Sequence, residues 1–155
     1  VEAAVEASGF AESIHRPGFL QSDSLARWYA FASAFVHPAV SEPWGLVVNE
    51  AAACGLPLLV SDRAGAVETF VPDGPETTGR RLDPFDEESM AASLAWVAGL
   101  PDEERRGLGT RAAAIAKEWG PERFARGALD AFQMAEDYER LRRTGSSKRA
   151  RTAVG

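Results

Sequence analysis

Two carboxylates, Glu42 and Glu50, flank a Pro-Trp-Gly turn and are separated by seven residues. Residues 45–54 read as a helix, so the backbone N–H groups of Gly45, Leu46 and Val47 have no acceptor within that helix. A helix start of this kind binds anions, because the free N–H groups and the helix dipole both favour negative charge. Gly45 has no side chain, which lets a phosphate approach the backbone closely.

Both carboxylates are placed to bind groups attached to such an anion. Glu50 lies about five residues into the helix, roughly 7 to 8 Å along its axis. A diphosphate at the helix start would bring ribose hydroxyls to Glu50, and carboxylates bind vicinal hydroxyls well. Glu42 lies on the other side of the phosphates, where it would meet a second sugar. The pattern therefore indicates a nucleotide-sugar site.

The spacing of the two acids is a weak signal by itself. Glu68 and Glu76 are also separated by seven residues. Glu76 follows a Pro-Asp-Gly-Pro turn, and we assign this second pair to solvated surface. The first pair differs in its context, because a strand precedes it, a helix carries the second acid and Cys-Gly-Leu-Pro ends that helix.

Strands and helices alternate along the chain, which predicts an α/β fold with a Rossmann-like, doubly wound parallel sheet. The apolar second strand is expected to be buried on both faces. Gly55 is the expected left-handed end of the second helix, with Pro57 just beyond it. We expect strands at residues 13–16, 34–37, 58–61 and 79–82, and helices at 22–32, 45–54 and 65–71, followed by C-terminal helices at 87–98, 102–118 and 121–143.

Histidine and cysteine offer little further chemistry. His15 and His37 are the only histidines, and we expect both to be strand residues, because neither has the spacing of a catalytic triad or a metal site. Cys54 is expected to be a small buried residue. One cysteine cannot form an internal disulfide, which fits a reducing compartment and a cytoplasmic location. We expect no metal and no other cofactor.

Length and charge exclude several classes of protein. The 155 residues predict one hydrophobic core, and no apolar stretch approaches the roughly 20 residues that span a bilayer. Six of the 17 basic residues follow Glu139, and no acidic residue does. Residues 1–139 therefore contain 11 basic and 23 acidic residues, a net charge of about −12, which disfavours binding to nucleic acid. Residues 144–155 read as a disordered basic tail, either a plain solvated terminus or a peripheral contact with an anionic membrane.

From residue 14 to about residue 132 the chain resembles the retaining glycosyltransferases of the two-domain B-type fold, often called glycosyltransferase group one. The resemblance rests on SEPWGLVVNEAAACGLPLLVSDRAGAVE (41–68), which is similar to the acidic-pair motif of that family and the helix, strand and turn that follow it. GFLQSDSLARWYAFASAFVHP (18–38) matches the preceding strand, helix and strand. The matching region corresponds to most of the family's carboxyl-terminal, donor-binding domain, and we assign residues 1–143 to an incomplete domain of this kind.

The resemblance implies transfer of a sugar from a nucleoside-diphosphate sugar to an unidentified acceptor, with retention. Glu42 would contact hydroxyls of the transferred sugar and act as the catalytic carboxylate. Glu50 would bind the ribose hydroxyls, and the backbone of residues 14–18 would lie near the nucleobase. Backbone amides of four further residues would line the diphosphate: Trp44, Gly45, Leu46 and Val47.

Several parts of the family have no counterpart in the 155 residues: the glycine-rich acceptor loop, the amino-terminal acceptor domain and the basic residues that clamp the diphosphate. The first strand of the donor domain is also missing, with a helix remnant at residues 1–7. We therefore expect a donor half, truncated at its amino-terminal edge and inactive alone. The alternatives are a non-catalytic nucleotide-sugar-binding module and a subunit that needs a separate acceptor-domain chain. A sugar-nucleotide epimerase is a third alternative, but the complete motif from Glu42 to Pro57 argues against it.

Overall fold

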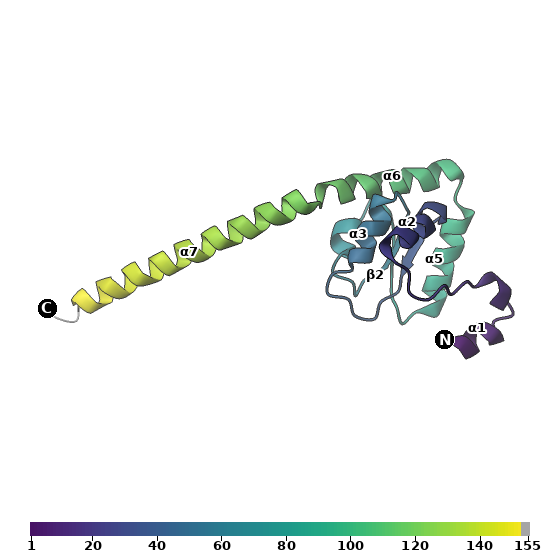
Figure 1. Cartoon of the computed structure of the whole chain (residues 1–155), viewed down its shortest axis with the longest axis horizontal. Helices are drawn as coiled ribbons and strands as arrows, with labels where there is room; N and C mark the ends of the chain where they lie inside the picture. The colour runs from purple at the N-terminus through teal and green to yellow at the C-terminus, as the bar shows by residue number, and fades with distance from the viewer. Residues whose placement is uncertain (153–155) are drawn as a thin grey trace. The chain divides into compact units, whose positions relative to one another are not determined.

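The computed structural model describes the backbone of residues 1–152 and, except at residues 22 and 143–152, their side chains. The chain divides into two compact units, Val1–Ala32 and Ser33–Gly155. Figure 1 colours the chain from its amino terminus to its carboxyl terminus and labels most of its elements.

The first unit contains three helical segments, α1 (Glu2–Ala7), the 3₁₀ helix η1 (Ala11–Ser13) and α2 (Ser22–Phe31). The helix predicted at residues 22–32 is confirmed. The strand predicted at residues 13–16 is wrong, and His15 lies in irregular backbone. A strand needs a neighbouring strand to exchange hydrogen bonds with, and the described residues of this unit form none.

The second unit is built on a parallel sheet with the strand order β1 (Phe35–His37), β2 (Leu58–Ser61), β3 (Gly79–Leu82). The strands predicted at residues 34–37, 58–61 and 79–82 are confirmed. All four residues of β2 are fully buried, but Val36 in β1 is 38% exposed. The strand predicted at residues 34–37 was expected to be buried on both faces. That expectation is wrong, because β1 is an edge strand of the described sheet.

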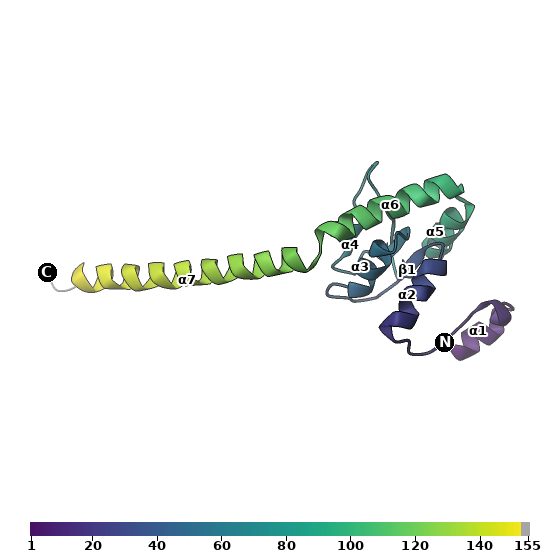
Figure 2. The same ribbon diagram turned by 45° about the horizontal axis from the view of Figure 1, so that its top comes forward.

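Helices cover both faces of the sheet, as in a doubly wound fold. On one face, Val97 of α5 packs in a core cluster with Leu59 and Leu82. Side chains alternate along a strand, so Leu58 and Val60 point to the opposite face, where α3, α4 and α6 contact one another and β2 (Figure 2). The helices of this unit are α3 (Leu46–Ala53), α4 (Val67–Phe70), α5 (Glu87–Gly99), α6 (Asp102–Glu118) and α7 (Pro121–Thr152).

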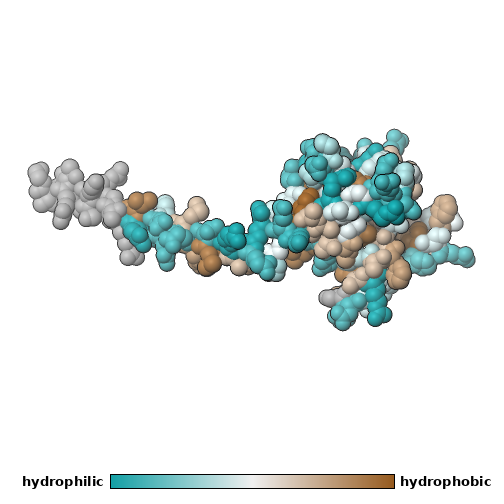
Figure 3. All heavy atoms as spheres, turned by 90° about the horizontal axis from the view of Figure 1, so that it is seen from above, coloured by the Kyte–Doolittle hydropathy of each residue, from teal (hydrophilic) through white to brown (hydrophobic). Residues whose placement is uncertain are grey.

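α7 begins at Pro121, as predicted, and passes its predicted end near residue 143. The backbone of the predicted tail is helical as far as Thr152, and the segment contains no proline that would end the helix. Residues 153–155 lie outside the described residues. None of the described helices is long and apolar enough to cross a bilayer. Figure 3 shows hydrophobic residues at intervals along α7, and six large ones are exposed: Phe124, Leu129, Phe132, Met134, Tyr138 and Leu141.

The end of α3 contacts α6 through backbone atoms. Gly55 adopts the predicted left-handed conformation, with a φ of 73°. A Cβ atom at Gly109 in α6 would lie 1.9 Å from the Gly55 carbonyl oxygen, so only glycine fits there. Cys54 is exposed rather than buried, because the contact with α6 is made by its neighbour Gly55.

We expect Gly109→Ala to destabilise the fold by about 1 to 3 kcal/mol, because α6 has to move away from α3. Gly107→Ala is the matched control in the same helix, since its Cβ would meet only the end of the Arg111 side chain at 3.7 Å. The control should stabilise the chain by up to about 1 kcal/mol through helix propensity. Urea unfolding measures both, and equal effects of the two substitutions would contradict the contact.

Candidate functional site

The candidate site lies at the carboxyl edge of the sheet, where the loop after β1 pairs with the loop after β2. Glu42 and Ala64 form an isolated parallel bridge. The Gly65 N–H donates to the Glu42 carbonyl at 2.9 Å, and the Ala66 N–H donates to the Trp44 carbonyl at 2.9 Å. The second loop thus fixes the backbone that carries Glu42.

Gly45 ends this loop as the N-cap of α3, with a φ of 97°. It is buried, and a Cβ at this position would lie 3.3 Å from the Glu42 Cγ, 3.4 Å from the Val48 Cγ2 and 3.7 Å from the His37 Nε2. The sequence suggested that glycine leaves room for a phosphate. The left-handed turn and the crowded neighbours themselves require glycine, and the close approach of a phosphate stays a prediction.

The first turn of α3 presents backbone N–H groups, as predicted. In the described part of the chain, nothing accepts a hydrogen bond from the N–H groups of Gly45, Leu46 or Val47. The Trp44 N–H differs, because it donates to Oε1 of Glu42 at 3.2 Å. Leu46 is 70% exposed, so the open part of the helix start is at Leu46 and Val47 rather than at the buried glycine.

The two carboxylates of the motif occupy different environments. Glu42 is half-buried against Gly45, whereas Glu50 is exposed. Glu50 follows Leu46 by four residues in α3, and residues at this spacing share one face of a helix. The structure thus brings Glu42, Trp44 and Gly45 together, with Glu50 one turn further along on the open side of α3.

An aromatic cluster that the sequence did not reveal lies beside the helix start. The Trp44 indole N–H donates to Oδ1 of Asn49 at 3.0 Å, and the Trp44 and Trp119 rings lie 5.4 Å apart. The Arg123 guanidinium lies over the Trp119 ring, 4.1 Å from its centroid. No spacing in the sequence pairs residue 44 with residue 119, because their contact depends on how the junction of α6 and α7 packs against α3.

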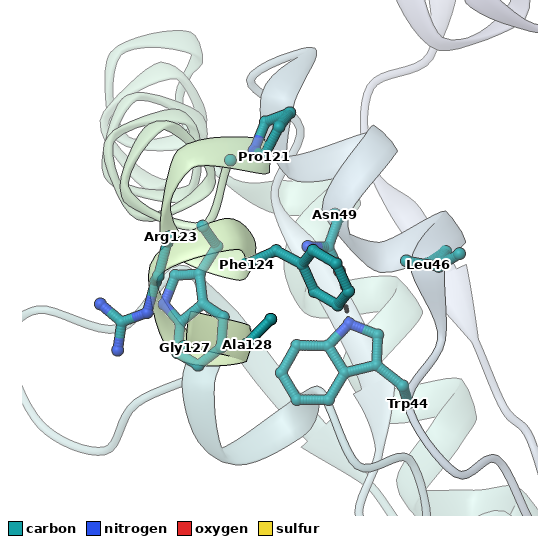
Figure 4. Close-up of a pocket in the computed structure, with 10 residues that line it drawn as sticks. Trp44, Leu46, Asn49, Pro121, Arg123, Phe124, Gly127 and Ala128 are labelled. Carbon is teal, nitrogen blue, oxygen red and sulfur yellow. Dashed lines mark hydrogen bonds between the residues drawn. The ribbon is translucent and has the colours of Figure 1, made fainter. Parts of the chain in front are cut away.

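A cavity of about 800 Å³ opens next to this cluster. Trp44 and Leu46 approach it from the start of α3, and Phe124 approaches it from the first turns of α7 (Figure 4). Apolar side chains dominate its wall. The described residues contain no group of three or more histidine, cysteine or acidic residues that could hold a metal ion.

Comparison with known proteins identifies relatives of this fold and motif. The family described as glycosyl transferases group 1 matches residues 1–115. D-inositol 3-phosphate glycosyltransferase from Kribbella flavida is 35% identical over 128 residues, which are 83% of this chain and 28% of that protein. The sulfoquinovosyl transferase of Arabidopsis thaliana is 40% identical over 97 residues, which are 62% of this chain and 18% of that protein.

A solved structure agrees with these relatives. Sucrose-phosphate synthase from Thermosynechococcus elongatus superposes with a TM-score of 0.69 and 28% identity. The match covers 90% of this chain and 33% of the synthase chain. The chain thus spans a third or less of the length of these three similar proteins.

A double-mutant cycle tests the contact between Trp44 and Asn49. Trp44→Phe keeps an aromatic ring but removes the indole N–H, and Asn49→Ala removes its acceptor. We expect a coupling free energy of about 0.5 to 1.5 kcal/mol, because each single change leaves a half-buried polar group unpaired. The free energy of unfolding in urea measures it, and strictly additive effects would show that the hydrogen bond does not stabilise the start of α3.

Proposed function

This chain belongs to the group 1 glycosyl transferases, and we propose that it binds the nucleoside-diphosphate sugar from which the sugar is transferred. In this proposal the diphosphate lies at the start of α3, the ribose reaches Glu50 and the transferred sugar reaches Glu42. One observation carries the proposal: the first turn of α3 offers N–H groups without described acceptors, between two carboxylates, at the carboxyl edge of a parallel sheet.

The electrostatics of α3 support the position of the diphosphate. The N–H groups of Leu46 and Val47 are donors at the positive end of the helix dipole, where anions are stabilised. In open α/β sheets, ligands bind in the crevice outside the carboxyl ends of the strands. The α3 start follows β1 at that edge, so both arguments select the same place.

The same charge assists the reaction that we propose. The bond between the anomeric carbon and the diphosphate oxygen breaks, and a bond forms from an acceptor hydroxyl oxygen to that carbon. Negative charge develops on the leaving diphosphate next to the start of α3, where fixed N–H donors stabilise it. The departing diphosphate takes up the hydroxyl proton, and we infer retention from the resemblance of the acidic-pair motif.

Glu42 is suited to orient the transferred sugar. Its backbone is fixed by the bridge to Ala64, and its carboxylate is held by the Trp44 N–H at 3.2 Å. Because this carboxylate is already held in place, little conformational entropy of its side chain is lost when sugar hydroxyls donate hydrogen bonds to it. Glu50 is exposed on the open side of α3, on the same helix face as Leu46, and in this proposal the ribose hydroxyls donate to its carboxylate.

The acceptor site belongs, in this proposal, to a part of the enzyme outside these 155 residues. The relatives are at least three times as long as the segment that matches this chain. We therefore expect donor binding by this chain and little sugar transfer by it alone.

We expect nucleoside diphosphates or their sugar conjugates to raise the melting temperature of this chain, in a panel of uridine, guanosine and adenosine derivatives. Glu50→Ala should weaken binding of the best ligand by about 1 to 3 kcal/mol, because charge-assisted hydrogen bonds to the ribose are lost. Glu76→Ala is the matched control, because Glu76 is exposed and belongs to the second acid pair. Isothermal titration calorimetry measures each affinity. An unchanged affinity of Glu50→Ala would remove the ribose role.

A further inference from the structure

His37 carries a buried polar atom that the proposed function does not use. Its Nε2 atom is buried and has no hydrogen-bond partner among the described residues. Its ring stacks on Phe35, with centroids 6.1 Å apart and planes inclined by 13°. Buried polar groups in folded proteins are normally paired, so an unpaired nitrogen at this place calls for an explanation.

The unpaired nitrogen lies beneath the candidate site. The point at which a Cβ of Gly45 would stand is 3.7 Å from the His37 Nε2 and 3.3 Å from the Glu42 Cγ. His37 is the last residue of β1, and Glu42 lies in the loop that follows it. The imidazole and the Glu42 side chain are therefore neighbours across the small space that Gly45 leaves free.

Packing alone does not explain a histidine here. A phenylalanine or a leucine would also fill the space against Phe35 without burying an unpaired nitrogen. What distinguishes histidine is a ring nitrogen that can donate a hydrogen bond as Nε2–H. The group it can serve is the nearby Glu42 carboxylate, whose Oε1 accepts from the Trp44 N–H.

We propose that His37 is a positioning residue for Glu42, and this inference rests on the proposed function. When a diphosphate binds at the start of α3, a phosphate oxygen accepts from the Trp44 N–H in place of the Glu42 carboxylate, whose side chain moves away while the backbone stays fixed. The His37 Nε2–H then donates to that carboxylate and keeps it directed toward the sugar. The exchange gives the buried nitrogen a partner only in the ligand-bound state.

Two substitutions of His37 separate this role from packing. His37→Phe keeps the ring that stacks on Phe35 and removes the nitrogen, whereas His37→Gln supplies an amide N–H group and loses the ring. We expect His37→Phe to weaken binding of the nucleoside-diphosphate sugar about tenfold, and His37→Gln to restore it to within about threefold of the wild type. A purely structural role predicts the reverse order, because glutamine disturbs the packing more.

Imidazole NMR of the unmodified chain provides a second test that does not depend on the folding of a variant. His15→Gln assigns the spectrum, because the chain has two histidines. We expect a hydrogen-bonded, slowly exchanging His37 Nε2–H signal on addition of the nucleoside-diphosphate sugar, and no such signal in Glu42→Ala.

The possible failures are distinguishable. Failure of the unmodified chain to bind any ligand of the panel would overturn the proposed function and this inference together. Binding by the unmodified chain with equal affinity in His37→Phe, or without a change in the His37 signal, would overturn only the role of His37.

Discussion

The geometry of the site depends on one backbone constraint, the left-handed conformation of Gly45 at the start of α3. The chain leaves β1 at the edge of the sheet and has to enter α3 within a short loop, and a φ of 97° makes that change of direction. The absence of a side chain lets Glu42 and His37 approach the same point. A left-handed residue with a side chain would be strained here and would also separate the neighbours that define the site.

A second constraint links the start of α3 to the end of the domain. Trp44 belongs to the motif, yet its ring contacts Trp119 at the end of α6, and Arg123 in α7 stacks on Trp119. α7 therefore begins against the site, and it continues with large apolar side chains exposed, such as Phe132 and Tyr138. The motif residue Trp44 thus serves the fold of this region as well as the proposed ligand.

Local signals were predictable from the sequence, and contacts between distant segments were not. The end of α3 was marked by Gly55 and Pro57, and the buried strand β2 by its apolar run, because conformation there is decided by adjacent residues. The prediction of a strand at residues 13–16 was wrong, because a strand needs a neighbouring strand to pair with and no local sequence pattern shows whether one is present. Burial of Gly45 and the unpaired nitrogen of His37 were also hidden, since both result from packing of the loop after β1 on α3.

The roles of Glu42, Glu50 and the first turn of α3 remain predictions from the motif, now with a defined backbone. The sequence placed these residues correctly around a helix start, because the turn and helix signals are local. It could not show that the Trp44 N–H is occupied by Glu42, since this hydrogen bond depends on a side-chain orientation.

The pairing of the two edge loops also limits how this region can change. A Cβ at Gly65 would lie 2.1 Å from the Pro43 carbonyl oxygen, and the Gly65 N–H donates to the Glu42 carbonyl. A segment that replaces residues 62–66 therefore has to keep glycine at position 65. A chimera with another member of the family would keep the site only where its residues 38–45 and 62–66 still approach each other as closely as these two backbones do.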